Sequence, residues 1–222
     1  SMSMPTISVI MPVFNGEQFL SKAIESILNQ TFSDFELIII NDGSTDNTKK
    51  IIAKYKAIDK RIIVKNQNNK GLTKSLNIAI SITKGEYIAR HDADDISLPH
   101  RFEKQIFWLK NKKYEIVFSR AYYNSKNRIT PRFSYFLPKY LLLNFFNPFI
   151  HGSLLVNKDI LIKVGGYDEN FIYSQDYKLY CDLIENNLKY KYIVEPLYFL
   201  NTHDNSISKQ KINEQAYYAK LA

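Results

Sequence analysis

Apolar residues follow two patterns along the first half of the chain. Short, nearly continuous apolar runs rich in β-branched residues are typical of strands buried on both faces. Such runs predict strands over residues 6–13, 35–40, 61–64 and 86–90. Between them, residues 17–30 and 72–80 repeat apolar positions at helical spacing, which predicts helices with one buried face. The order is strand, helix, strand, with short connections.

This alternation predicts an α/β fold, with a mainly parallel, Rossmann-like sheet that helices cover on both faces. The second half is less regular, and we expect it to add a smaller mixed or antiparallel portion. Its apolar runs predict helices over 99–110 and 175–188 and strands over 114–122, 153–156 and 190–200.

We expect one domain over residues 1–222 with two halves, 5–110 and 111–207. The tail, 208–222, stops without a boundary signal, which leaves open a longer natural chain.

The net charge of +8 is compatible with nucleic acid, an anionic membrane surface or phosphorylated substrates as partners. The lysines are scattered, and there is no zinc-finger spacing, RNP-like motif or run of five basic residues, so we expect no nucleic-acid partner. A single cysteine excludes an internal disulfide and favours a reducing compartment, so we expect a cytoplasmic protein. No apolar window approaches the roughly 20 residues of a membrane span, and the N-terminus lacks a signal-peptide pattern.

Polar clusters follow three of the predicted strands, at residues 14–16, 41–43 and 92–95. In such sheets, ligands bind at the carboxyl ends of the strands. Asp92, Asp94 and Asp95 crowd three carboxylates together, and these like charges raise one another's pKa unless a cation compensates. Mg²⁺ or Mn²⁺, which take carboxylate and diphosphate oxygens, would be a natural partner. The alternative is a solvated turn in which Asp95 caps the next helix.

The turn at residues 41–46 (NDGSTD) places Asp42 where its carboxylate can accept hydrogen bonds from a nucleobase edge or a ribose hydroxyl. A purely structural turn, with Ser44 or Thr45 capping the following helix, is the alternative. No G-x-G-x-x-G follows either early strand and no P-loop motif is present, which disfavours a dinucleotide-binding fold and a P-loop NTPase.

Taken together, the motifs resemble family-2 glycosyltransferases of the A-type fold. The motifs are 11–16 (MPVFNG), 41–46 (NDGSTD), 69–72 (NKGL) with Asn77, and 90–95 (RHDADD) with Pro99 and Arg101. This resemblance covers about the first 110 residues. Residues 151–152, 165–168 and 175–179 resemble the family's acceptor-side region less specifically, and Gln175 stands where the family usually has glutamate.

The resemblance implies an inverting transfer of a sugar from a nucleoside diphosphate, most often uridine diphosphate, to a glycan or lipid-linked acceptor. By the same resemblance, Asp176 is the catalytic base and Mn²⁺ or Mg²⁺ is bound by Asp94 and His203. The implied nucleotide site is Pro12, Phe14, Asn15, Asp42, Lys70, Asp92 and Ala93. The implied contacts to the donor sugar or acceptor are Arg90, Asp95, His151, Gly166 and Gln175.

Several of these assignments have alternatives. Lys70 and Arg90 are equally plausible as partners of nearby carboxylates, and His203 as a surface or capping residue. The aromatic segment 133–149 and His151 are expected to line an acceptor pocket, to touch a membrane as a peripheral protein does, or simply to pack. The rival functions are a catalytically silent nucleotide-sugar-binding module and a sugar nucleotidyltransferase.

Overall fold

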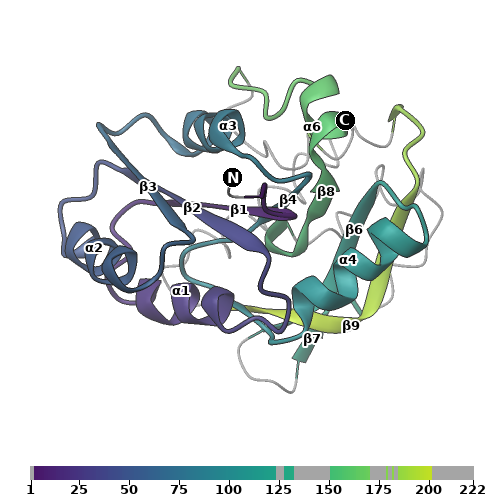
Figure 1. The fold of residues 1–222 in the computed structure, drawn as a ribbon, viewed down its shortest axis with the longest axis horizontal. Coiled ribbons are helices and arrows are strands. Elements are labelled where there is room, and N and C mark those ends of the chain that lie inside the picture. The colour runs from purple at the N-terminus through teal and green to yellow at the C-terminus, as the bar shows by residue number, and fades with distance from the viewer. Residues whose placement is uncertain are drawn as a thin grey trace.

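The computed structural model describes residues 3–123, 128–132, 151–170, 179, 182 and 185–201. The first half alternates strands and helices as predicted (Figure 1). Its elements are β1 (Ile7–Val13), α1 (Leu20–Leu28), β2 (Phe35–Asp42), α2 (Thr48–Ile58), β3 (Ile62–Gln67), α3 (Leu72–Ile82) and β4 (Tyr87–Arg90). The second half contributes β5 (Ile96–Ser97), α4 (Arg101–Asn111), β6 (Ile116–Tyr123), β7 (Arg128–Thr130), a 3₁₀ turn (His151–Ser153), β8 (Leu155–Asn157), α6 (Lys158–Lys163) and β9 (Tyr190–Leu200).

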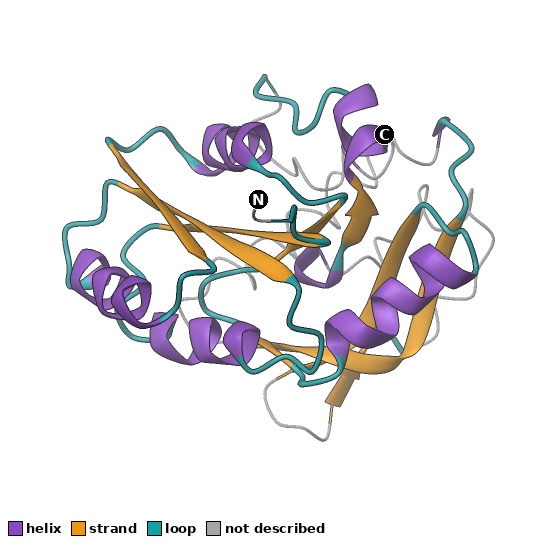
Figure 2. Cartoon of the chain, viewed as in Figure 1, coloured by secondary structure: helices purple, strands orange, loops and turns teal. Residues whose placement is uncertain are grey.

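One mixed sheet takes strands from both halves, and its strands are drawn in orange in Figure 2. The strand order is β3-β2-β1-β4-β8-β6-β9-β5, with β7 paired to β6. Strands β1, β2, β3 and β4 are parallel neighbours, as predicted. Strand β8 is antiparallel to both β4 and β6, whereas β6 and β9 pair in parallel. The α/β fold with a mixed second portion is therefore confirmed. The parallel pairing of β6 with β9 was not anticipated.

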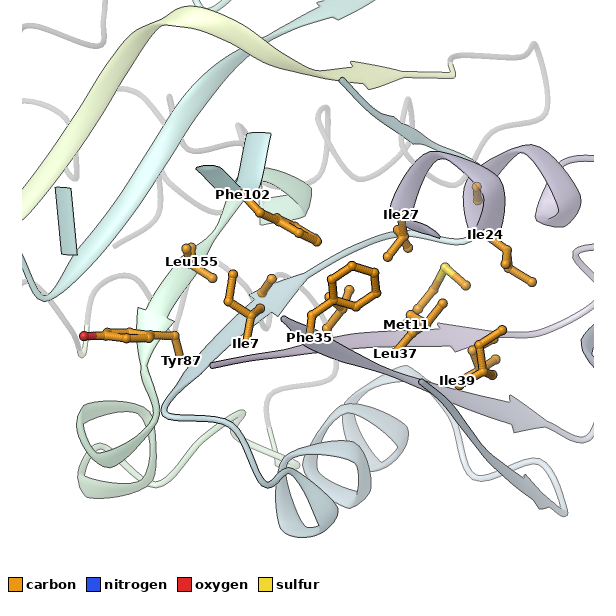
Figure 3. Packing of buried hydrophobic residues seen from close by; sticks show 14 of the residues in the cluster. Ile7, Met11, Ile24, Ile27, Phe35, Leu37, Ile39, Tyr87, Phe102 and Leu155 are labelled. Carbon is orange, nitrogen blue, oxygen red and sulfur yellow. The ribbon is translucent and has the colours of Figure 1, made fainter. Parts of the chain in front are cut away.

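The core lies on both faces of this sheet because each strand alternates its side chains between them. In β2, Phe35, Leu37 and Ile39 join the cluster that packs under α1, α2 and α4, while Ile38 and Ile40 pack under α3 and α6. Figure 3 shows the first three side chains together with Ile24 and Ile27 of α1. The apolar runs are thus buried on both sides, as a nearly continuous hydrophobic strand requires. No helix in the described part of the chain is long and apolar enough to cross a membrane.

The beginning of α2 differs from the sequence-based expectation. Neither Ser44 nor Thr45 caps this helix, which begins at Thr48, where the Asp46 carboxylate accepts a hydrogen bond from the Thr48 N–H (2.9 Å). The predicted helix over 175–188 lies mostly outside the described residues.

Candidate active site

Two loops at the carboxyl edge of the sheet are bound to each other. The Asn15 N–H donates to the Ser44 hydroxyl (2.9 Å), and the Asn15 amide oxygen accepts from the Thr45 N–H (2.8 Å). Gly16 donates in the same way to the Thr48 hydroxyl (2.9 Å). These bonds join the loop after β1 to the loop after β2 and leave the Phe14 side chain 54% exposed beside them. An exposed aromatic ring on a fixed loop can stack against a flat ligand.

Asp42 organises the loop that leads into α3. One carboxylate oxygen accepts hydrogen bonds from the Lys70 N–H (2.7 Å) and from the Gln67 amide (3.0 Å), and the other accepts from the Gly71 N–H (3.0 Å). The residue is only 4% exposed. A carboxylate has about four acceptor positions, so Asp42 has capacity for one further donor while it holds the loop. The Lys70 side chain is exposed.

The acidic turn follows β4 directly. Arg90 is fully buried, and its Nη1 lies 2.9 Å from an oxygen of Asp92, whose side chain is 16% exposed. Ala93 and Asp94 are half-buried at the turn. Two of the predicted site residues, Asp92 and Asp94, therefore lie at the same sheet edge as Asp42 and the loop that carries Phe14.

Asp95 does not share this exposure. Its carboxylate is fully buried and accepts hydrogen bonds from the Tyr198 hydroxyl (2.8 Å) and the Asn201 N–H (2.9 Å). Burial, followed by the charges of Asp94 and Asp92, raises the pKa of Asp95 well above its usual value.

Arg90 and Asp95 were expected to contact a sugar, and these contacts stay predictions. Both side chains are fully buried and bonded within the protein. The alternative for Asp95, a cap on the following helix, is wrong, because His100 is the N-cap residue of α4.

Buried polar residues beneath the turn were missed as part of the site. The Arg101 guanidinium donates to the carbonyls of Arg90 (3.0 Å) and Leu154 (3.1 Å), to the Ser97 hydroxyl (3.1 Å) and to the Gln105 amide oxygen (2.9 Å). Burial lowers the pKa of Arg101 to about 10, so it is charged at neutral pH. The sequence motif contained Arg101, but nothing in the sequence indicated these four partners.

His91 is the second such residue. Burial, followed by the nearby charge of Arg101, lowers its pKa to about 3, so the ring is neutral. Its Nδ1 lies 2.7 Å from the Asp92 carbonyl oxygen. A carbonyl can only accept, so Nδ1 carries the proton. His91 thereby supports the backbone of the acidic turn and adds no charge to it.

The acceptor-side motif is attached to α3. The Asn77 side chain accepts a hydrogen bond from the Tyr167 N–H (3.0 Å) and donates one to the Tyr167 carbonyl (2.8 Å). Gly166 has φ +65°, and a Cβ there would lie 2.8 Å from the Asn77 side-chain oxygen. Glycine is therefore required at this position for two reasons. His151 begins the 3₁₀ turn that precedes β8, whereas Gln175, Asp176 and His203 lie outside the described residues.

The donor atoms at the turn fit a hard divalent cation. Within the described residues, no group of three His, Cys, Asp or Glu side chains is arranged to hold a metal ion. Mg²⁺ and similar ions are usually bound by one or two carboxylates together with substrate phosphates. The half-buried Asp92 and Asp94 supply such carboxylates, so the residues present are compatible with a cation that arrives with a diphosphate.

The fold and the acidic turn define an A-type glycosyltransferase. The structure of Staphylococcus aureus TarS, residues 1–349, in complex with UDP-GlcNAc superposes with a TM-score of 0.79 at 18% identity, over 96% of this chain and 64% of that one. The Pyrobaculum calidifontis mannosyltransferase PcManGT, in complex with GDP-Man and Mn²⁺, superposes with a TM-score of 0.74 at 17% identity, over 100% of this chain and 66% of that one. At these identities the likeness shows the fold alone.

The sequence comparisons give the family. The profile described as glycosyl transferase family 2 matches residues 8–176, and the chain belongs to this family. An uncharacterized glycosyltransferase of Methanocaldococcus jannaschii is 38% identical, over 95% of this chain and 76% of its own length. The Escherichia coli O-antigen biosynthesis glycosyltransferase WbnJ is 34% identical, over 96% and 84%. The E. coli UDP-Glc:α-D-GlcNAc-diphosphoundecaprenol β-1,3-glucosyltransferase WfaP is 31% identical, over 95% and 83%.

Proposed function

We propose that this glycosyltransferase is metal dependent and inverting, and that it moves a sugar from a UDP-linked donor to a glycan or lipid-linked acceptor. The observation that carries the proposal is the shared sheet edge. There the carboxylates of Asp92 and Asp94 follow β4, the loop held by Asp42 follows β3, and the exposed ring of Phe14 follows β1.

The named relatives support the choice of substrates. TarS is described in complex with UDP-GlcNAc, and PcManGT with a nucleotide sugar and Mn²⁺. The name of WfaP specifies a UDP-linked donor and a diphosphoundecaprenol-linked acceptor. A lipid-linked acceptor would bring this protein to the cytoplasmic face of a membrane as a peripheral protein.

Each part of the edge has a task in the proposed reaction. Phe14 and the loop held by Asp42 bind the nucleoside, and Asp92 contacts the ribose or the cation. Asp94, with His203, would hold Mn²⁺ or Mg²⁺, and the ion would supply positive charge against the diphosphate leaving group. Asp176 accepts the proton of the acceptor hydroxyl as that oxygen attacks the anomeric carbon from the face opposite the leaving diphosphate. The buried Arg90 side chain balances the charge of Asp92 through its ion pair with that carboxylate.

The proposal can be tested by product analysis. The protein is incubated with a panel of nucleotide sugars, Mn²⁺ and acceptors that carry a terminal sugar on a diphosphate lipid analogue. We expect UDP release and an inverted anomeric configuration by NMR, both abolished by EDTA and restored by Mn²⁺. Nucleotide-sugar binding without any product would favour the silent binding module. With pyrophosphate added, formation of a nucleoside triphosphate together with a sugar phosphate would favour the nucleotidyltransferase.

The Asp94→Ala variant is expected to lose the Mn²⁺-dependent binding of UDP, because it removes a carboxylate ligand of the cation. Loss of an outer-shell partner costs about 10- to 100-fold in metal affinity, so loss of a direct ligand should cost at least about 100-fold. Calorimetric titration of Mn²⁺ in the presence of UDP measures the effect. Asp159→Ala, at an exposed aspartate of α6, is the matched control. Unchanged Mn²⁺ affinity in Asp94→Ala would contradict the metal assignment.

A further inference from the structure

Tyr198 joins both ends of the acidic turn to strand β9. Its hydroxyl oxygen accepts a hydrogen bond from the Asp92 N–H (3.0 Å), and the hydroxyl donates to the Asp95 carboxylate (2.8 Å). These residues are 106 and 103 positions away in the sequence. A single phenol group therefore fixes the first backbone amide of the turn and its last side chain.

The second oxygen of Asp95 is also held from β9. It accepts the Asn201 N–H at 2.9 Å, immediately after β9 ends at Leu200. The turn itself is closed by the Asp95 N–H, which donates to the Asp92 carbonyl (3.3 Å). The segment from Asp92 to Asp95 thus makes two hydrogen bonds with Tyr198 of β9 and one with Asn201, the residue after β9, and Asp94 lies inside this segment.

The position of the phenol is set by close packing. Tyr198 is fully buried, and the His91 ring meets it edge-on with ring centres 5.2 Å apart. A Cβ atom at Gly152 would lie 2.4 Å from the tyrosine ring and its hydroxyl, so the 3₁₀ turn presses directly against it. Because the ring has no room to move, its hydroxyl is a fixed reference point for the turn.

The arrangement keeps a third carboxylate buried beside Asp92 and Asp94, which is unfavourable electrostatically. A neutral side chain at position 95 would remove this repulsion. The carboxylate instead accepts one hydrogen bond from Tyr198 and one from Asn201, while the side chains of Asp92 and Asp94 remain partly exposed. Partners that orient metal ligands in this way strengthen metal binding even though they do not touch the ion.

We propose that Tyr198, acting through Asp95 and the Asp92 backbone, is a positioning residue for the divalent cation at Asp94. This inference rests on the proposed metal-dependent function. The phenol holds the turn in its cation-binding conformation before the cation arrives. Cation binding therefore does not have to order the turn.

The test is calorimetric titration of Mn²⁺ into each variant in the presence of UDP, together with thermal unfolding without metal. Tyr198→Phe and Asp95→Asn are each expected to weaken Mn²⁺ binding by about 10- to 100-fold. The double variant should lose less than the product of the two single losses, because the two residues act through one hydrogen bond. Tyr198→Phe removes two hydrogen bonds and should lower the Tm without metal by about 4–8 °C, at roughly 2–4 °C for each hydrogen bond in a chain of this size.

Tyr192→Phe is the matched control. It removes another buried phenol from β9, roughly 20 Å along the strand from Tyr198, and should leave Mn²⁺ affinity unchanged. The inference is overturned if Tyr198→Phe binds Mn²⁺ as tightly as the unaltered protein, or if Tyr192→Phe weakens binding equally. Failure of the unaltered protein to bind Mn²⁺ with UDP would instead contradict the proposed function itself.

Discussion

The Asp176→Asn variant is expected to lose about 10²- to 10⁴-fold in kcat, the range that a positioned general base typically contributes. Asparagine has the same shape as aspartate, but it cannot take the proton of the acceptor hydroxyl. Donor binding does not involve this proton, so the affinities for UDP and Mn²⁺ should be unchanged. Steady-state kinetics, with calorimetry on the same samples, separates the two quantities.

The control for this prediction is Glu185→Gln, which neutralises an exposed carboxylate nine positions further along the chain. It should leave kcat within about twofold of the unaltered protein, since surface substitutions away from a site have small effects. A near-normal kcat in Asp176→Asn would remove the base assignment. A parallel loss of UDP affinity would indicate that the residue acts in donor binding instead.

The elements of the first half could be predicted because local pattern and tertiary burial agree there. Strand β2 is apolar on both faces because helices cover both faces, and the sequence shows this directly. The boundaries were less predictable. The beginning of α2 depends on Ser44 and Thr45, which bind Asn15 in another loop and are therefore not used as caps. A contact across about 30 positions leaves no signal in a local window.

The acidic turn shows the same limit at the site. The sequence places three aspartates together, but it does not show which of them face outward. In the structure Asp92 and Asp94 are partly exposed while Asp95 is buried, and the difference arises because Asp95 bonds Tyr198 and Asn201 more than 100 positions away. Tyr198 lies in an apolar strand, where its hydroxyl gives no local indication of a role.

The strand pairing of the second half could not be predicted from the sequence either. Strand β9 was predicted with its observed bounds, Tyr190–Leu200, because its apolar run is long and rich in aromatic and β-branched residues. Its neighbours were not predictable, since pairing with β6 in parallel requires a long intervening connection whose path the pattern does not encode. This pairing matters for function because it brings Tyr198 beneath the turn after β4.

The Arg101→Met variant is expected to lower the free energy of unfolding by about 2–4 kcal/mol. Methionine fills much of the same volume, but the Gln105 amide oxygen and the Arg90 carbonyl then lose the guanidinium donor, and each unsatisfied buried acceptor costs about 1–3 kcal/mol. Removal of a buried charge offsets part of this loss. The offset is incomplete because the polar partners remain buried, and urea unfolding followed by circular dichroism measures the net effect.

Two further variants show whether the acceptors, rather than the charge, cause the loss. Arg101→Lys keeps a cation but lacks the fork of donors that reaches several acceptors at once, so its stability should fall between those of Arg101→Met and the unaltered protein. Lys104→Met removes a cation from the same helix, where Lys104 pairs with Glu195 near the surface, and should change stability by less than about 1 kcal/mol. If Arg101→Met proved as stable as the unaltered protein, the two carbonyls and the Gln105 amide would have to find other donors. Arg101 would then be dispensable for the support of the turn that carries Asp92 and Asp94.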